Sequence, residues 1–209
     1  MLSWRLADGV MLLAAILLLW SCRAEKADAG HRSILPCDVR LRAGDVVFRR
    51  GGSVMSHSVV LLDAHGQYSH VGIVVDSAGV PMVVHAVPGE PDFEGDVDRV
   101  KMERPAEFFD AQRASCGEVC RLDDSVAAAG AARVALQVYE RRTLFDHHYD
   151  TADTASMYCT ELVIHAYRRQ GLELVDTEAG HVELPGFTFD CYFPSHVYES
   201  HLLHSVVRF

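Results

Sequence analysis

The sequence predicts a single globular domain that mixes β-strands with α-helices. Three observations lead to this prediction: short β-branched runs between turn formers, two such runs joined by a short turn as in a hairpin, and two long segments with apolar residues at helical spacing. The chain has 209 residues, 49% hydrophobic and 23% charged, which is enough to bury a core. Its formal net charge of -10, without any run of Lys and Arg, excludes nucleic acid as an expected partner.

The first 22 residues are typical of a bacterial signal peptide. Arg5 precedes an unbroken apolar run of eleven residues, Val10 to Trp20, which is too short to span a bilayer but suits a signal-peptide core. Ser21 and Cys22 complete a segment that resembles a lipobox, in which the cysteine is diacylated after cleavage. We therefore expect lipid attachment at Cys22 and anchoring to the membrane.

The residues that follow define the predicted start of the folded domain. Cleavage after Ala29, at an A-x-A site rather far from the apolar run, is the alternative to lipidation. Both alternatives predict an exported protein, periplasmic or attached to a membrane. Residues 23–36 are predicted to form a polar tether, and residues 37–209 the domain.

Strands are predicted where β-branched runs lie between turn formers. The stretch 67–75, QYSHVGIVV, has the pattern of a buried strand with the ionisable His70 near its start. After a short turn, the stretch 81–87, PMVVHAV, is predicted to be the hairpin partner of this strand. Further strands are expected after the turn at 43–44 and at 98–102.

Four segments are predicted to be helical. The longest, 125–142, begins after an acidic cap and ends on two arginines. The clearest, 158–170 or YCTELVIHAYRRQ, has an apolar face and closes at Gly171. Shorter helices are expected at 54–64 and from 105 to 112.

Export changes the expected state of the six cysteines, because disulfides persist in an oxidising compartment. With Cys22 assigned to lipidation, an odd number remains, so at least one thiol should be free or paired between chains. The spacing Cys116-x-x-x-Cys120 does not match a structural zinc site. Cys37 and Cys191 are a candidate disulfide pair, and a thiol left over is a candidate for chemistry.

Cys159 has the position of an activated nucleophile. It lies in the first turn of its predicted helix, where the dipole and the backbone N–H groups stabilise a thiolate and an oxyanion. His70 could act as its base if the strand packs on the helix. His85 lies on the hairpin partner, about 5 Å away in a sheet, and could orient the imidazole of His70. Each residue alone is an ordinary structural residue in most proteins, so the combination carries the hypothesis.

The order of these segments resembles a known enzyme family. The sequence is similar to the circularly permuted papain-like amidases of the NlpC superfamily, specifically the YiiX-like group, over roughly residues 39 to 208. The matching segments are LRAGDVVF at 41–48, YSHVGIVV at 68–75, VVHAV at 83–87 and YCTELVIHAY at 158–167.

The resemblance implies a fold, an activity and three catalytic residues. The fold is α+β, a small antiparallel sheet or half-barrel packed against helices. Cys159 is implied as nucleophile, His70 as base and His85 as the third polar residue, where this group commonly has a glutamate. A histidine stabilises an imidazolium less than a carboxylate does, so this departure bears on the electrostatics of the site. Tyr68, Tyr149 and Tyr158 are candidate substrate contacts.

We therefore expect an exported cysteine hydrolase that cleaves an amide bond through a thioester, with peptides of the cell wall as the first substrate class. One alternative is a hydrolase or acyltransferase of lipid amides or esters on the same site. Another is a catalytically silent lipoprotein that binds wall fragments. No cofactor is expected, and the oligomeric state is left open.

A metal site is a rival of a different class. Twelve histidines are many for this length, and the local cluster His147-His148-x-Asp150 is the best candidate. It lacks a second group of ligands at metal-binding spacing, so a solvated loop is the favoured interpretation and no metal is expected.

Overall fold

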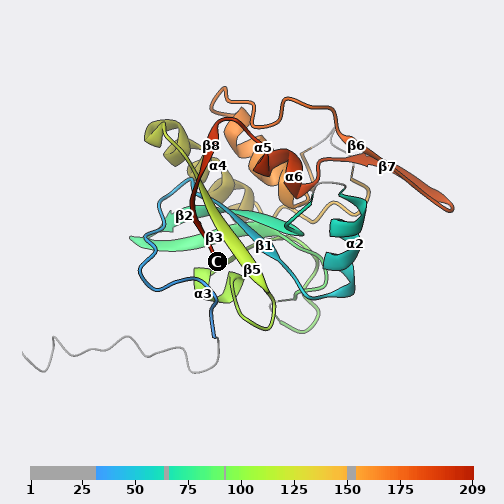
Figure 1. The fold of residues 1–209 in the computed structure, drawn as a ribbon, viewed down its shortest axis with the longest axis horizontal. Coiled ribbons are helices and arrows are strands. Elements are labelled where there is room, and N and C mark those ends of the chain that lie inside the picture. The colour runs from blue at the N-terminus through green and yellow to red at the C-terminus, as the bar shows by residue number, and fades with distance from the viewer. Residues whose placement is uncertain (1–31, 64–65, 92, 150–153) are drawn as a thin grey trace, which may run out of the picture. The chain divides into compact units, whose positions relative to one another are not determined.

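The computed structural model describes residues 32–63, 66–91, 93–149 and 154–209 (Figure 1). The predicted signal peptide, Cys22 and residues 23–31 of the predicted tether lie outside this range. From Arg32 to Phe209 the chain forms one compact unit, and two hydrophobic clusters are built from its residues. This unit therefore contains a core of its own.

Six strands form one antiparallel sheet, in the order β4-β3-β2-β1-β5-β8. A separate hairpin of two strands, β6 and β7, projects from the body (Figure 1). The strands are β1 (Val46–Arg50), β2 (His70–Ser77), β3 (Val80–Ala86), β4 (Val100–Glu103), β5 (Cys116–Leu122), β6 (Gly180–Leu184), β7 (Phe187–Cys191) and β8 (Leu203–Arg208).

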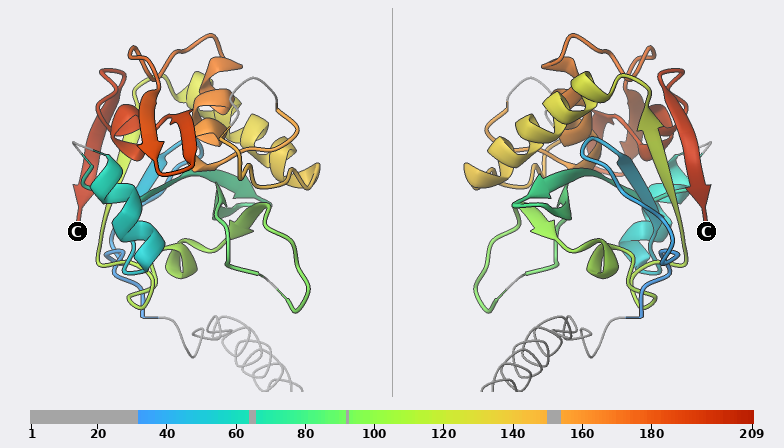
Figure 2. Two further views of the ribbon diagram at one scale, coloured as in Figure 1. Left: turned by 90° about the vertical axis from the view of Figure 1, so that its right-hand side faces the viewer. Right: turned by 90° about the vertical axis from the view of Figure 1, so that its left-hand side faces the viewer.

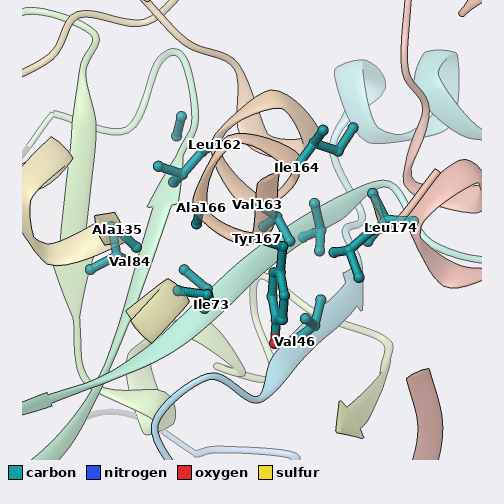
Figure 3. Close-up of a cluster of buried hydrophobic side chains, with 14 of the residues drawn as sticks. Val46, Ile73, Val84, Ala135, Leu162, Val163, Ile164, Ala166, Tyr167 and Leu174 are labelled. Carbon is teal, nitrogen blue, oxygen red and sulfur yellow. The ribbon is translucent and has the colours of Figure 1, made fainter. Parts of the chain in front are cut away.

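Helices cover both faces of the sheet. The described helices are α2 (Val54–Leu62), α3 (Pro105–Phe108), α4 (Ser125–Glu140), α5 (Cys159–Arg168) and α6 (Pro194–Tyr198). Helices α4 and α5 lie together over one face (Figure 2), where they share the larger hydrophobic cluster with Val46, Ile73 and Val84 (Figure 3). Phe108 of α3 packs on the other face with Val47 and Val74. Successive residues of a strand alternate between these two cores, as the pleat requires.

Helix α5 forms because sequence pattern and capping agree. Leu162, Val163, Ala166 and Tyr167 are buried on one face, as their spacing predicts. At the start, the Glu161 carboxylate lies 3.4 Å from the backbone nitrogen of Tyr158, in the arrangement of a capping box. Buried contacts with α4 and β2 thus fix the helix whose first residue is Cys159.

The predicted α+β class is confirmed, and so is the hairpin of β2 and β3. The helix expected at 105–112 is shorter and ends at Phe108. The strand β5 was missed, because it contains Gly117 and the charged Glu118 in place of an apolar run. Glu118 is fully buried since Tyr68 Oη donates to it at 2.5 Å and Arg208 Nε at 2.8 Å.

The turn before β1 is held to the rest of the fold by a buried carboxylate. Asp45 accepts two bonds from the guanidinium of Arg121, at 2.7 and 2.8 Å, and one from the backbone nitrogen of Arg42 at 2.7 Å. The neighbouring carbonyl of Gly44 accepts a bond from the hydroxyl of Tyr167. The Gly-Asp pair of the motif LRAGDVVF therefore ties β1 to β5 and to α5.

Replacement of Asp45 by Ala should lower the free energy of unfolding by about 3 kcal/mol, because it removes a buried carboxylate that accepts bonds from Arg121 and from the backbone of Arg42. Glu173→Ala is the matched control: it removes the exposed partner of Arg168 and should cost less than about 1 kcal/mol. Urea unfolding of both variants measures the difference. Equal, small effects would contradict the structural role given to Asp45.

Candidate active site

A cavity of about 740 Å³ lies at the start of helix α5 and strand β2. Cys159 and His70 both line it. The backbone N–H of Val71, the residue after His70, forms a hydrogen bond to the sulfur of Cys159. The predicted nucleophile and the predicted base therefore share one cavity, although they are 89 positions apart in the chain.

His70 and His85 are joined directly. Nε2 of His70 lies 2.9 Å from Nδ1 of His85, within hydrogen-bond distance across the hairpin. Both rings pack on Phe108, with centroids 5.7 and 5.3 Å from that of its ring. Gly72 leaves room for this arrangement, because a Cβ there would lie 3.2 Å from the Cβ of His85 and 2.8 Å from Val83 Cγ1. The glycine of YSHVGIVV is thus required by close approach of the two strands.

A carboxylate, that of Glu103, lies next to His85 on the side away from His70. Oε1 of Glu103 on β4 lies 3.1 Å from Nε2 of His85, an ion-pair distance at which the ring N–H points off the line to the oxygen. The other carboxylate oxygen accepts from Nη1 of Arg113 at 2.9 Å. His85 therefore lies between His70 and the carboxylate of Glu103.

In the bond between the two rings one nitrogen donates and the other accepts, and the tautomer decides which. Because a carboxylate only accepts, we infer from the 3.1 Å separation from Glu103 that Nε2 of His85 carries a proton and that its Nδ1 is the acceptor. Nε2 of His70 is then the donor of the bond between the rings. The remaining nitrogen, Nδ1 of His70, is left with a lone pair, as a base requires.

Cations surround the two histidines. Arg49 is buried, lies over the ring of Phe108 at 4.7 Å and pairs with Glu90 at 3.1 Å. Arg113 also pairs with Glu90, and Nζ of Lys101 donates to the backbone carbonyl of Glu90 at 2.5 Å. Three cationic side chains, those of Arg49, Lys101 and Arg113, are therefore balanced by only two carboxylates, those of Glu90 and Glu103, in this group of residues.

Burial and the excess of cations both lower the pKa values of the two histidines. Burial lowers the pKa of His70 well below its usual value, and the charges of Arg49 and Arg113 lower it further. Burial and the same two cations, with Lys101, also lower the pKa of His85. Both imidazoles are consequently neutral at physiological pH.

Burial raises the pKa of the Cys159 thiol to about 11. Four smaller effects lower this pKa but do not outweigh burial: hydrogen bonds from the backbone N–H groups of Val71, Thr160 and Cys159 itself, and the charge of Arg49. The resting site is therefore a thiol beside a neutral imidazole, not a thiolate beside an imidazolium.

Two of the three predicted tyrosine contacts line the cavity. Tyr149 stacks on Phe189 with ring centroids 4.8 Å apart, and it meets the edge of Tyr158 at 5.3 Å. The hydroxyl of Tyr158 accepts a bond from the backbone nitrogen of Tyr192 at 3.0 Å. Tyr68 is absent from the described lining of the cavity: it is buried against Glu118, on the side of β5 and β8. A structural role accounts for Tyr68.

The candidate disulfide between Cys37 and Cys191 is not formed, and both residues are free thiols. Cys37 is exposed in the segment that precedes β1, whereas Cys191 is buried at the end of β7 and lines the cavity that contains Cys159. Cys116 and Cys120 are free as well, within β5. The expectation of a disulfide rested on the compartment alone, with no geometric constraint.

The local histidine cluster takes part in a different contact. His147 pairs with Asp98 at 3.2 Å, and Asp150 lies outside the described residues. Within residues 32–63, 66–91, 93–149 and 154–209, no group of three or more His, Cys, Asp or Glu side chains is arranged to hold a metal ion.

Comparison with protein families identifies the class to which this fold and this site belong. A family model described as permuted papain-like amidase enzyme, YaeF/YiiX, C92 family, matches residues 40–179, which include Cys159, His70, His85 and Glu103. The chain therefore belongs to the permuted papain-like amidases, a family of cysteine peptidases and amidases.

Among solved structures, the chain resembles one titled as the metalloprotein YiiX from Escherichia coli O157:H7. The two share 17% identity and a TM-score of 0.63, over 82% of this chain and 99% of the other. This similarity supports the permuted papain-like fold. A comparison with curated protein sequences finds no match.

The alkylation rate of Cys159 should depend on pH as that of a buried, protonated thiol. We expect the rate with iodoacetamide to rise about tenfold per pH unit from about pH 6 to about pH 9, because only the thiolate reacts and its pKa lies above this range. Mass spectrometry of the cysteine-containing peptides follows each thiol separately. A plateau near neutral pH would reveal a preformed thiolate and contradict the neutral resting site.

Proposed function

We propose that the protein is an exported cysteine hydrolase that cleaves an amide or related acyl bond through a thioester at Cys159. The observation that carries the proposal is the shared cavity, which is lined by Cys159 at the start of α5 and by His70, the first member of the chain His70–His85–Glu103. A structural cysteine would require neither the cavity nor the oriented imidazole. Membership of the family supports the class of reaction.

In the proposed first step, Sγ of Cys159 attacks the acyl carbon while its proton passes to Nδ1 of His70. The imidazolium that forms is stabilised through His85 by the carboxylate of Glu103. Backbone N–H groups at the start of α5 are available to the oxyanion. His70 then returns the proton to the leaving amine as the bond between carbon and nitrogen breaks.

The second step regenerates the thiol. His70 takes a proton from water, the resulting hydroxide attacks the thioester, and the acid departs as the sulfur regains its proton from the imidazolium. Because the thiol is protonated at rest, each turnover begins and ends with the same neutral pair. The proposed base therefore needs its neutral form, which the surrounding cations favour.

Two substrate classes fit this chemistry, and the cavity favours the second. Cell-wall peptides remain the first expectation for an exported enzyme of this type. Half of the residues that line the wall, however, have apolar or aromatic side chains, and these suit an acyl chain. They are Met55, Val59, Leu62, Ala86, Val87, Pro88, Phe145, Tyr149, Tyr158, Leu184, Phe189, Tyr192, Phe193 and Pro194. A lipid-amide or lipid-ester hydrolase is thus the second candidate.

Membrane attachment through a diacylated Cys22 is part of the proposal and rests on the lipobox-like sequence. No helix in the described part of the chain is long and apolar enough to cross a bilayer. Intact mass spectrometry of the exported protein, which distinguishes a diacylated Cys22 from an N-terminus after Ala29, tests this part.

A series of acyl-amides with one leaving amine and acyl groups of increasing length tests the function. If the cavity binds an acyl chain, kcat/KM should rise at least about tenfold from acetyl to decanoyl. An intact-mass increase equal to the acyl group should appear at Cys159 and be absent in Cys159→Ala. The control Cys37→Ser removes an exposed thiol outside the described cavity wall and should leave both readouts unchanged.

Three outcomes separate the alternatives. Turnover of wall peptides, with no preference for acyl length, would overturn the lipid candidate and keep the hydrolase. Wall-fragment binding with no acyl adduct on any substrate would support the catalytically silent lipoprotein. Turnover that survives in Cys159→Ala would refute the nucleophile.

A further inference from the structure

Helix α2 exposes more apolar surface than a helix of a soluble domain ordinarily does. Val54 and Leu61 are 85% and 84% exposed, and Met55 is 60% exposed. None of its nine residues is buried, and the stretch from Gly51 to Leu62 contains no Lys, Arg, Asp or Glu. A helix this apolar is normally covered by a partner.

The exposed surface continues into the cavity that contains Cys159. Met55 and Leu62 of α2 line this cavity, and Leu184, 43% exposed at the end of β6, lines it as well. In Figure 2, left, α2 and the β6–β7 hairpin face the same side of the molecule. We call the exposed apolar side chains of α2 together with Leu184 the apolar rim.

Charge selects among the partners that could cover this surface. The rim itself has no charged side chain, and the chain as a whole carries a formal charge of -10. On the hairpin, Glu183 and Asp190 each contact His181 and are exposed. An anionic bilayer would repel this protein, whereas zwitterionic head groups impose no such cost and their acyl layer accepts Val, Leu and Met side chains.

The length of chain outside the described residues places the domain near such a surface. If Cys22 carries the lipid, nine residues, 23–31, separate the anchor from Arg32. Fully extended, they reach about 30 Å, comparable to the size of the domain. A surface of apolar side chains is thereby held at high effective concentration against a bilayer.

We propose that the apolar rim inserts into a zwitterionic lipid layer and brings the cavity mouth to the bilayer, so that acyl-bearing substrates enter Cys159's cavity from the lipid. This extends the proposed function to its lipid-substrate candidate. Insertion itself does not depend on catalysis, since Val54 and Leu61 lie outside the described cavity wall. The two proposals can therefore fail separately.

Flotation of residues 32–209 with phosphatidylcholine vesicles tests the inference without the N-terminal anchor. Val54→Ser/Leu61→Ser should lower vesicle binding by about tenfold for each side chain removed. The matched control Val80→Ser/Val126→Ser replaces two valines that are 52% and 78% exposed and do not line the cavity, and should bind as wild type. Circular dichroism verifies that both variants are folded.

Cys159→Ala should float as wild type does, whatever the outcome of the activity series. Failure of the wild-type unit to float would overturn the inference, as would an equal loss in the control variant. Recovery of the wild-type unit as a dimer that Val54→Ser/Leu61→Ser dissociates would assign the rim to a second copy instead and also overturn it.

Discussion

The contact between His70 and His85 is the interaction on which the site depends. It joins two neighbouring strands through their side chains, at the point where β2 begins next to the first turn of α5. Its geometry needs Gly72 beside it, Phe108 beneath it and Glu103 behind it. Through these partners, one hydrogen bond couples the sheet, the short helix α3 and the strand β4 to the chemistry of Cys159.

The same arrangement determines the protonation states of the two histidines. A buried imidazolium beside Arg49, Arg113 and Lys101 would add a further positive charge to a cluster that is already positive. The state in which both imidazoles are neutral is therefore the stable one. In the proposed attack, Glu103 stabilises the imidazolium of His70 through His85 and not directly. In this proposal His85 transmits the influence of the acid and does not replace it.

The sequence predicts features that depend on neighbouring residues and misses those that depend on residues far apart in the chain. The strand with His70, its hairpin partner and the helix of Cys159 are local patterns, and their relation came from the resemblance of whole segments in order. Glu103 could not be assigned, because β4 contributes one glutamate among 29 acidic residues and only strand pairing brings it to His85. β5 was missed because a buried Glu118 needs Tyr68 and Arg208, which are distant in sequence.

Nitrogen-15 NMR of the imidazole side chains at neutral pH tests the central claim most directly, because it reports protonation and tautomer at each ring nitrogen. The account predicts that His70 and His85 are both neutral, with the proton of each on Nε2 and an unprotonated Nδ1 on His70. In Glu103→Gln, His85 should lose this single tautomer. An imidazolium at His70, or a proton on its Nδ1 in the wild-type protein, would contradict the account.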